Sequence, residues 1–116
     1  MSVIPSQFGV LARALEVGSA RHQVVSQNLA NVNTPGYRAA EVRFEEEMAS
    51  YLRHGDTDSN GPAIHVLEGG AQRIDGNNVD IDQQIGLLQE NASRFQACMQ
   101  LLSSQLQTMR SAITGR

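Results

Sequence analysis

The sequence predicts a mainly α protein in which two long terminal helices form an elongated antiparallel coiled-coil hairpin, with a short irregular or β segment between them. Apolar residues recur at heptad spacing near both ends of the 116-residue chain, as is typical of helices that pack on other helices. Aromatic residues make up only 4% of the chain and Trp is absent, so large anchors for a compact core are few. The C-terminal heptad segment would form a helix about 50 Å long. Such a helix does not fit inside a compact domain of this length, whose radius of gyration is about 13 Å.

The C-terminal segment carries the clearest periodicity. Its apolar steps alternate four and three residues without a proline, through Ile81, Ile85, Leu88, Ala92, Phe95, Met99, Leu102, Leu106, Met109 and Ile113. This pattern predicts a helix over 81–113 with one apolar seam. Asp80 stands where an N-cap is expected, with Gln83 three residues later, and Gly115 stands where a C-terminal cap glycine is expected.

The N-terminal segment shows the same period with two polar or small interruptions. The stripe runs through Phe8, Leu11, Leu15, Gly18, His22, Val25, Leu29 and Val32. It predicts a helix over 6–30, which Thr34, Pro35 and Gly36 would end because proline forces its predecessor out of helical geometry. Gly18 is either a tolerated weak point or a place where two helices approach closely. For His22, a packed or interface histidine is the expectation.

The segment between the two helices has a different texture. Tyr37 begins a short extended piece, and a helix of two to three turns is expected over 44–53. The polar stretch 54–62 predicts a mobile loop, and 64–74 is compatible with a small hairpin. We divide the chain into 1–36 (N-terminal helix and turn), 37–79 (middle segment) and 80–116 (C-terminal helix), which together form one structural unit.

Composition excludes several classes of function. The net charge is −3, and the nine basic residues are all Arg and are scattered, so the basic patch of a nucleic-acid binder is missing. No stretch has the length of a membrane span, and the first 18 residues lack the basic and apolar regions of a cleaved signal peptide. The single Cys98 and the three His residues show no metal-ligand spacing. We therefore expect no catalytic residues, no metal, no cofactor, no nucleic-acid partner and no membrane insertion.

The apolar stripes are wider than one coiled-coil seam needs. Leu87, Cys98 and Leu101 flank the C-terminal stripe. A two-helix hairpin alone has a thin core, and exposed apolar stripes mark protein interfaces. The sequence thus predicts an assembly subunit whose ends become ordered when neighbouring molecules cover them.

Two short segments carry a more specific signal. The signature segment is 28–37, Asn-Leu-Ala-Asn-Val-Asn-Thr-Pro-Gly-Tyr, and the entry segment is 75–82, Asp-Gly-Asn-Asn-Val-Asp-Ile-Asp. The signature segment resembles the one that follows the N-terminal helix of the bacterial flagellar axial proteins, a family of rod, hook and hook-associated proteins. The short chain, the run from Tyr37 to Phe44, the entry segment and the closing run from Arg110 to Gly115 resemble the short rod proteins of that family. The resemblance covers 8–53 and 75–115.

The resemblance implies a structural subunit of the proximal rod that transmits torque between the membrane ring and the distal rod or hook. Its partners would be copies of itself in a helical rod, other rod proteins, the adaptor FliE, the membrane-supramembrane ring and the type III export apparatus. It would lie in the periplasmic part of the basal body after export without a cleaved signal. The expected assembly interface comprises Leu11, Leu15, Val25, Asn28, Leu29, Asn31, Thr34, Pro35, Gly36, Tyr37, Asn78, Asp80, Ile85, Leu88, Phe95, Met99, Leu102, Leu106, Met109 and Ile113.

Three alternatives stay open at this point. The chain could be a generic coiled-coil adaptor or secretion chaperone, which would form a stable dimer alone. It could be another short rod protein, of the FlgC type. A helix-turn-helix DNA-binding protein with its turn at Thr34-Pro35-Gly36 is disfavoured by the acidic balance of the chain.

Overall fold

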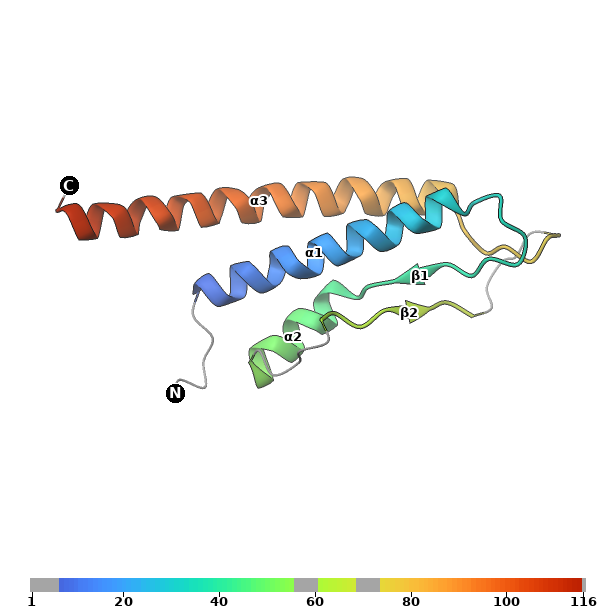
Figure 1. Cartoon of the computed structure of the whole chain (residues 1–116), viewed down its shortest axis with the longest axis horizontal. Coiled ribbons are helices and arrows are strands. Elements are labelled where there is room, and N and C mark those ends of the chain that lie inside the picture. Colours follow the sequence, from blue (N-terminus) through green and yellow to red (C-terminus); the bar gives the residue numbers. More distant parts are fainter. Residues whose placement is uncertain (1–6, 56–60, 69–73, 116) are drawn as a thin grey trace.

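The protein is an elongated molecule built in three layers around one central helix (Figure 1). The computed structural model describes residues 7–55, 61–68 and 74–115. Helix α3 (Ile81–Thr114) forms one layer and α1 (Gln7–Ala30) the middle one. The third layer contains β1 (Ala40–Glu41), α2 (Phe44–His54) and β2 (His65–Val66). The principal extents are 64 × 28 × 17 Å with a radius of gyration of 17.7 Å, and α1 and α3 run antiparallel, so the predicted elongated hairpin is confirmed.

Helix α1 ends where the signature segment leaves helical geometry. Its last residue is Ala30, after which the amide of Thr34 donates to the carbonyl of Asn31 and the amide of Tyr37 donates to that of Thr34. Gly36 has a φ of +74°, which glycine adopts without the steric cost that a side chain would add. Ser6, the first residue of the predicted helix, lies outside the described residues.

The middle segment forms a two-stranded antiparallel ribbon and a short helix. Ala40 pairs with Val66 and Glu41 with His65, whereas the sequence predicted that 64–74 would form a hairpin by itself. The rest of that expected hairpin, 69–73, and most of the expected loop, 56–60, lie outside the described residues. Helix α2 has three glutamates in its first turn and ends with Arg53 and His54, a charge order that suits the helix dipole.

Helix α3 has the caps that the sequence predicts. The side chain of Asp80 accepts hydrogen bonds from the amides of Asp82 at 3.1 Å and Gln83 at 3.3 Å. Gly115 adopts the left-handed conformation, and its amide donates to the carbonyl of Ser111 at 2.8 Å. These local contacts satisfy backbone groups that each helix end leaves unpaired.

The small apolar core lies between α1 and the third layer, not between the two long helices. Val17 and Val24 of α1 pack with Val42, and the half-buried side chains around them are Ala20, Ala40, Phe44 and Met48. Helix α1 therefore uses one face for this core and another for α3.

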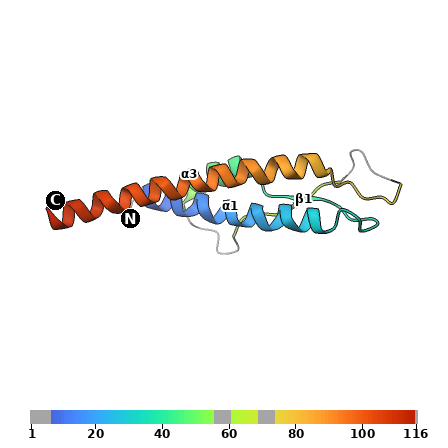
Figure 2. The same cartoon turned by 90° about the horizontal axis from the view of Figure 1, so that it is seen from above.

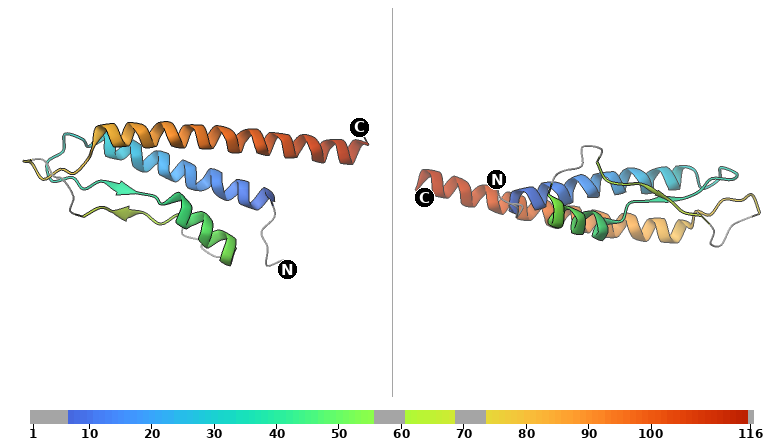
Figure 3. Two further views of the ribbon diagram at one scale, coloured as in Figure 1. Left: turned by 180° about the vertical axis from the view of Figure 1, so that it is seen from behind. Right: turned by 90° about the horizontal axis from the view of Figure 1, so that it is seen from below.

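The two long helices differ in length, and this difference leaves part of α3 unpaired. Helix α1 has 24 residues and α3 has 34. Gln105 contacts Gln7, the first residue of α1. The last part of α3 therefore extends beyond the described start of α1, as both the view from above and the view from behind show (Figures 2 and 3).

Candidate functional site

The signature and entry segments, which are far apart in sequence, meet at one end of the hairpin through asparagine side chains. Asn28 is fully buried (0% exposed) and uses every hydrogen-bonding group of its amide. Its Nδ2 donates to the carbonyl of Ala40 at 2.8 Å and to Oε1 of Gln84 at 2.9 Å. Its Oδ1 accepts from the amide of Ala40 at 3.0 Å and from the hydroxyl of Tyr37 at 3.1 Å. One side chain thus ties α1 to β1, to the signature segment and to α3.

Asn77 caps the turn that follows α1. Its Nδ2 lies within hydrogen-bond distance of the carbonyls of Asn31, Val32 and Thr34, at 2.9, 3.2 and 2.8 Å. Its Oδ1 accepts from the amide of Val79 at 2.8 Å. A buried amide thereby satisfies carbonyls that the helix end leaves without helical partners.

Asn78 joins the same turn to the ribbon. Its Oδ1 accepts from the amide of Ala39 at 2.6 Å, and its Nδ2 donates to the carbonyl of Leu67 at 3.1 Å. The backbones also meet directly, because the amide of Gly36 donates to the carbonyl of Asp75 at 2.7 Å. A Cβ on Gly76 would lie 3.5 Å from the Cα of Gly36. We call this arrangement, centred on Asn28, Asn77 and Asn78, the asparagine clasp.

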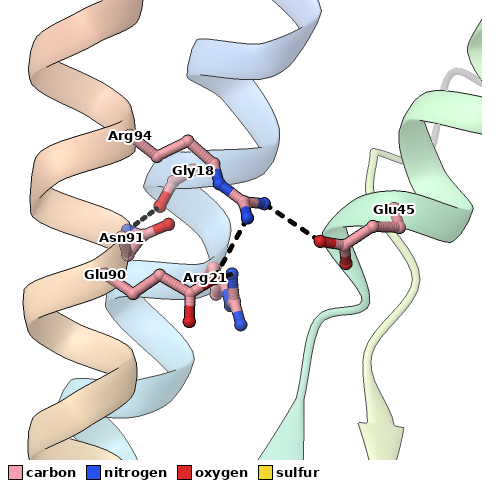
Figure 4. Close-up of polar contacts among 6 residues, drawn as sticks. All are labelled: Gly18, Arg21, Glu45, Glu90, Asn91 and Arg94. Carbon is pink, nitrogen blue, oxygen red and sulfur yellow. Dashed lines mark hydrogen bonds and ion pairs between the residues drawn. The ribbon is translucent and has the colours of Figure 1, made fainter.

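The contact between α1 and α3 contains further buried amides. Asn91, only 3% exposed, donates from Nδ2 to the backbone carbonyl of Gly18 at 2.8 Å (Figure 4). Gln105 donates to Oε1 of Gln7 at 2.5 Å. Oδ1 of Asn91 and Oε1 of Gln105 are buried without a hydrogen-bond partner among the described residues. A Cβ on Gly18 would meet Phe95 at 3.7 Å and Asn91 at 3.8 Å, ordinary contact distances, so this helix pair does not require glycine there.

A charged network connects α3 to the third layer. Arg94 pairs with Glu90 at 3.0 Å within α3 and with Glu45 of α2 at 3.3 Å (Figure 4). Its guanidinium carbon lies 4.3 Å from the centre of the Phe44 ring, within the range of a cation–π interaction. Arg21 of α1 approaches Glu90 at 3.9 Å. A hydrogen bond with its own backbone amide, and then Arg94, lower the pKa of Glu45 below its ordinary value of 4.5.

Three parallel rows of side chains run along α3, each with a seven-residue spacing. The inner row faces α1, and the middle and outer rows follow it around the helix. The inner row contains polar or small residues: Gln84, Asn91, Cys98 and Gln105. The middle row contains Ile81, Leu88, Phe95, Leu102 and Met109. The outer row contains Ile85, Ala92, Met99, Leu106 and Ile113.

The row that faces α1 is not the one that the sequence predicted. The predicted seam combined the middle and outer rows, but α1 covers the inner row and only part of the middle row. All five outer-row residues are exposed, among them Met99 (46%) and Leu106 (52%). In the middle row, Leu88 and Leu102 are half-buried, whereas Phe95 and Met109 are exposed. The apolar stripe therefore exists along the whole of α3, and much of it has no cover from within the described chain.

The remaining predicted interface residues fall into two groups. Val25 is buried and Leu11, Leu15 and Leu29 are half-buried in α1, while Thr34, Pro35 and Gly36 form an exposed tip beside the clasp. Asn31 bonds locally, to the carbonyl of Gln27 and the hydroxyl of Thr34. His22 is exposed, so it is not packed within the chain.

The interface predicted from the sequence omits Asn77, Gln84 and Asn91, although Asn77 lies in the entry segment. The signal that could have found two of them is the seven-residue recurrence of the inner row beside two apolar rows. A polar residue repeated at a seam position of a coiled coil is typically a buried register contact.

The side chains of the site are suited to binding other proteins. Within the described part of the chain, no group of three or more His, Cys, Asp or Glu side chains could hold a metal ion. None of the described helices is both long and apolar enough to cross a membrane. The site consists of the asparagine clasp at one end of the hairpin and the long apolar face of α3.

Comparison with known proteins shows which proteins this chain resembles. A family model described as flagella basal body rod protein matches residues 9–38, which contain the signature segment. The chain is 28% identical to flagellar basal body rod protein FlgB of Bacillus subtilis, an alignment that covers 99% of this chain and 98% of that protein. It is 29% identical to FlgB of Cereibacter sphaeroides over 99% of each chain, and 26% identical to FlgB of Salmonella typhimurium over 88% of each. Over nearly its whole length, the chain is similar to flagellar basal-body rod proteins.

The similarity to rod proteins agrees with the site geometry. The relatives align with both the clasp segments and α3, so the similarity extends well beyond the signature. A rod protein is a structural subunit, and an elongated helical chain with an uncovered apolar face has the form that such a subunit needs.

Proposed function

We propose that this chain is a structural subunit of the proximal rod that transmits torque between the membrane ring and the distal rod and hook. The observation that carries the proposal is the apolar outer row of α3, exposed along its full length. An exposed apolar face of this length marks a site where other subunits bind. In this proposal the chain catalyses no reaction and uses no cofactor.

The occupant of the outer row, in this proposal, is a helix of a neighbouring subunit in the rod. Two features of α3 support this. The opposite side of the helix has no large apolar side chains, so only one side of α3 offers an apolar binding face. The row on that opposite side contains Gly86, Ser93, Gln100 and Gln107. The last turns of α3 extend past the described start of α1, and could therefore lie against a subunit stacked along the rod axis.

The wider set of partners follows from the family. We propose copies of this chain, other rod proteins, the adaptor FliE and the membrane-supramembrane ring as neighbours in the periplasmic part of the basal body. Export through the type III apparatus without a cleaved signal completes the proposal.

Charge substitutions in the outer row test the proposal. Met99→Asp and Leu106→Asp change residues that are exposed in the free subunit, so each should alter its free energy of unfolding by about 0.5 kcal/mol or less. In the assembled rod each would bury an unpaired carboxylate and lose apolar contact worth about 2 kcal/mol. We expect the amount of subunit recovered in purified basal bodies to fall at least about tenfold, since 1.4 kcal/mol is one decade in binding.

Gln100→Asp is the matched control, because it adds the same charge to the polar side of α3. Its recovery in basal bodies should equal that of the unchanged chain. Normal recovery of both Met99→Asp and Leu106→Asp would contradict the outer-row assignment. Light scattering of the free chain separates the remaining alternative: a stable, well-defined dimer would favour a coiled-coil adaptor or secretion chaperone.

A further inference from the structure

The rotation of α3 about its own axis does not follow from apolarity alone. Neighbouring heptad rows lie about 50° apart around a helix. If burial of apolar area decided the rotation, α3 would turn its middle and outer rows toward α1, since all ten of these residues are apolar. The structure instead places Gln84 (2% exposed) and Asn91 against α1 and leaves the outer row in solvent.

The asparagine clasp provides the physical reason at the first of these positions. Three of the four hydrogen bonds of Asn28 go to Ala40 and Tyr37, which hold its side chain in place independently of α3. Its remaining N–H points to Oε1 of Gln84. A rotation of α3 by one row would carry Gln84 away and leave this buried donor unpaired, which is costly.

A second polar contact lies two helical turns after Gln84 along α3. Asn91 reaches the backbone carbonyl of Gly18, with Phe95 beside it. Because Gln84 and Asn91 lie seven residues apart on the same row, the two contacts together define both rotation and register. Oδ1 of Asn91 is left without a hydrogen-bond partner among the described residues, so this seam is not arranged for the greatest stability.

We propose that Gln84 and Asn91 are positioning residues that lock the rotation of α3, so that its outer row stays turned outward. Buried polar residues that give up stability to specify one helix arrangement are known from coiled coils. The value of an outward row rests on the proposed assembly function. The lock itself is a property of the free subunit and can be measured there.

Thiol labelling of the free subunit tests the lock, because thiol reactivity follows exposure. The native chain reports on the inner row through Cys98, which is half-buried. A Cys98→Ser, Met99→Cys chain reports on the outer row. Each is compared with the same chain carrying Gln84→Leu and Asn91→Leu. We expect the ratio of the labelling rate at position 99 to that at position 98 to fall at least about fivefold on removal of the lock.

A purely structural role would give a different result. Loss of packing without rotation would raise both labelling rates and leave their ratio unchanged, and that outcome in a folded variant overturns the proposal. Ser93→Leu with Gln100→Leu is the matched control: it adds the same two side chains to the polar side of α3 and should not change the ratio.

The single variants keep the test decisive if the double variant loses its circular dichroism signal. Asn91→Leu retains the Gln84 contact with Asn28, and Gln84→Leu retains the Asn91 contact with Gly18. Each should shift the ratio in the same direction by a smaller factor. Unfolding of both single variants would also overturn the proposal, since it requires that a rotated, apolar packing be available. Recovery in basal bodies plays no part in this test, so failure here leaves the Leu106→Asp result unaffected.

Discussion

Replacing Asn28 with Ala should remove a large share of the stability of the free subunit. The side chain makes four hydrogen bonds in a fully buried setting. At about 1 kcal/mol each, their loss costs about 4 kcal/mol, because the partner groups stay buried. Alanine is a better helix former than asparagine and returns roughly 0.5 kcal/mol. The free energy of unfolding should therefore fall by about 3.5 kcal/mol, against the total of about 6–17 kcal/mol usual for a chain of this length.

Urea unfolding followed by circular dichroism measures this change. Asn33→Ala is the matched control, since Asn33 belongs to the same signature segment but is exposed. It should change the free energy of unfolding by about 0.5 kcal/mol or less. A loss below about 1 kcal/mol for Asn28→Ala, or equal losses for both variants, would show that the four bonds do not stabilise the fold as argued.

Two further outcomes follow from the contacts described above. Gly18→Ala should raise the midpoint of thermal unfolding by about 4 °C, because alanine stabilises the helix by about 1 kcal/mol relative to glycine. The added Cβ would meet Phe95 and Asn91 at ordinary contact distances. A lower midpoint in differential scanning calorimetry would show that the two helices are too close there for a side chain. The contribution of Glu45 to stability should be present above pH 4.5 and disappear as the pH falls below it, because its pKa is lowered in the folded chain. Comparison with Glu45→Gln in urea should show a difference of a few tenths of a kcal/mol at pH 7, since the side chain is largely exposed, and a smaller difference as acid protonates the carboxylate. A difference that grows with acid would reverse the assigned sign.

The positions of the helices could be predicted because helix ends depend on neighbouring residues. Asp80 accepts from amides two and three residues later, and Gly115 closes the other end of α3 through Ser111. The exit from α1 at Thr34-Pro35-Gly36 is equally local. The pairing of β1 with β2 was not predicted, because strands of two residues carry almost no periodicity.

The meeting of the signature and entry segments lay beyond the reach of sequence patterns. Both segments were recognisable as unusual, but a single sequence does not state that the amide of Asn77 lies on the carbonyls of Asn31 and Thr34, more than 40 residues earlier. Asn residues in such positions read equally well as turn formers. Whether such an Asn is a buried connector depends on which segments cover it, and only the folded chain shows this.

The sequence by itself determined that α3 is a long helix with more apolar surface than one partner can cover, since heptad spacing and capping act within a few residues. Only the tertiary structure decided which row of that helix faces α1. That choice depends on buried polar groups finding partners 56 and 73 residues away, as Gln84 does with Asn28 and Asn91 with Gly18. An unpaired buried amide costs more than an exposed leucine, and the apolar outer row is therefore left facing outward.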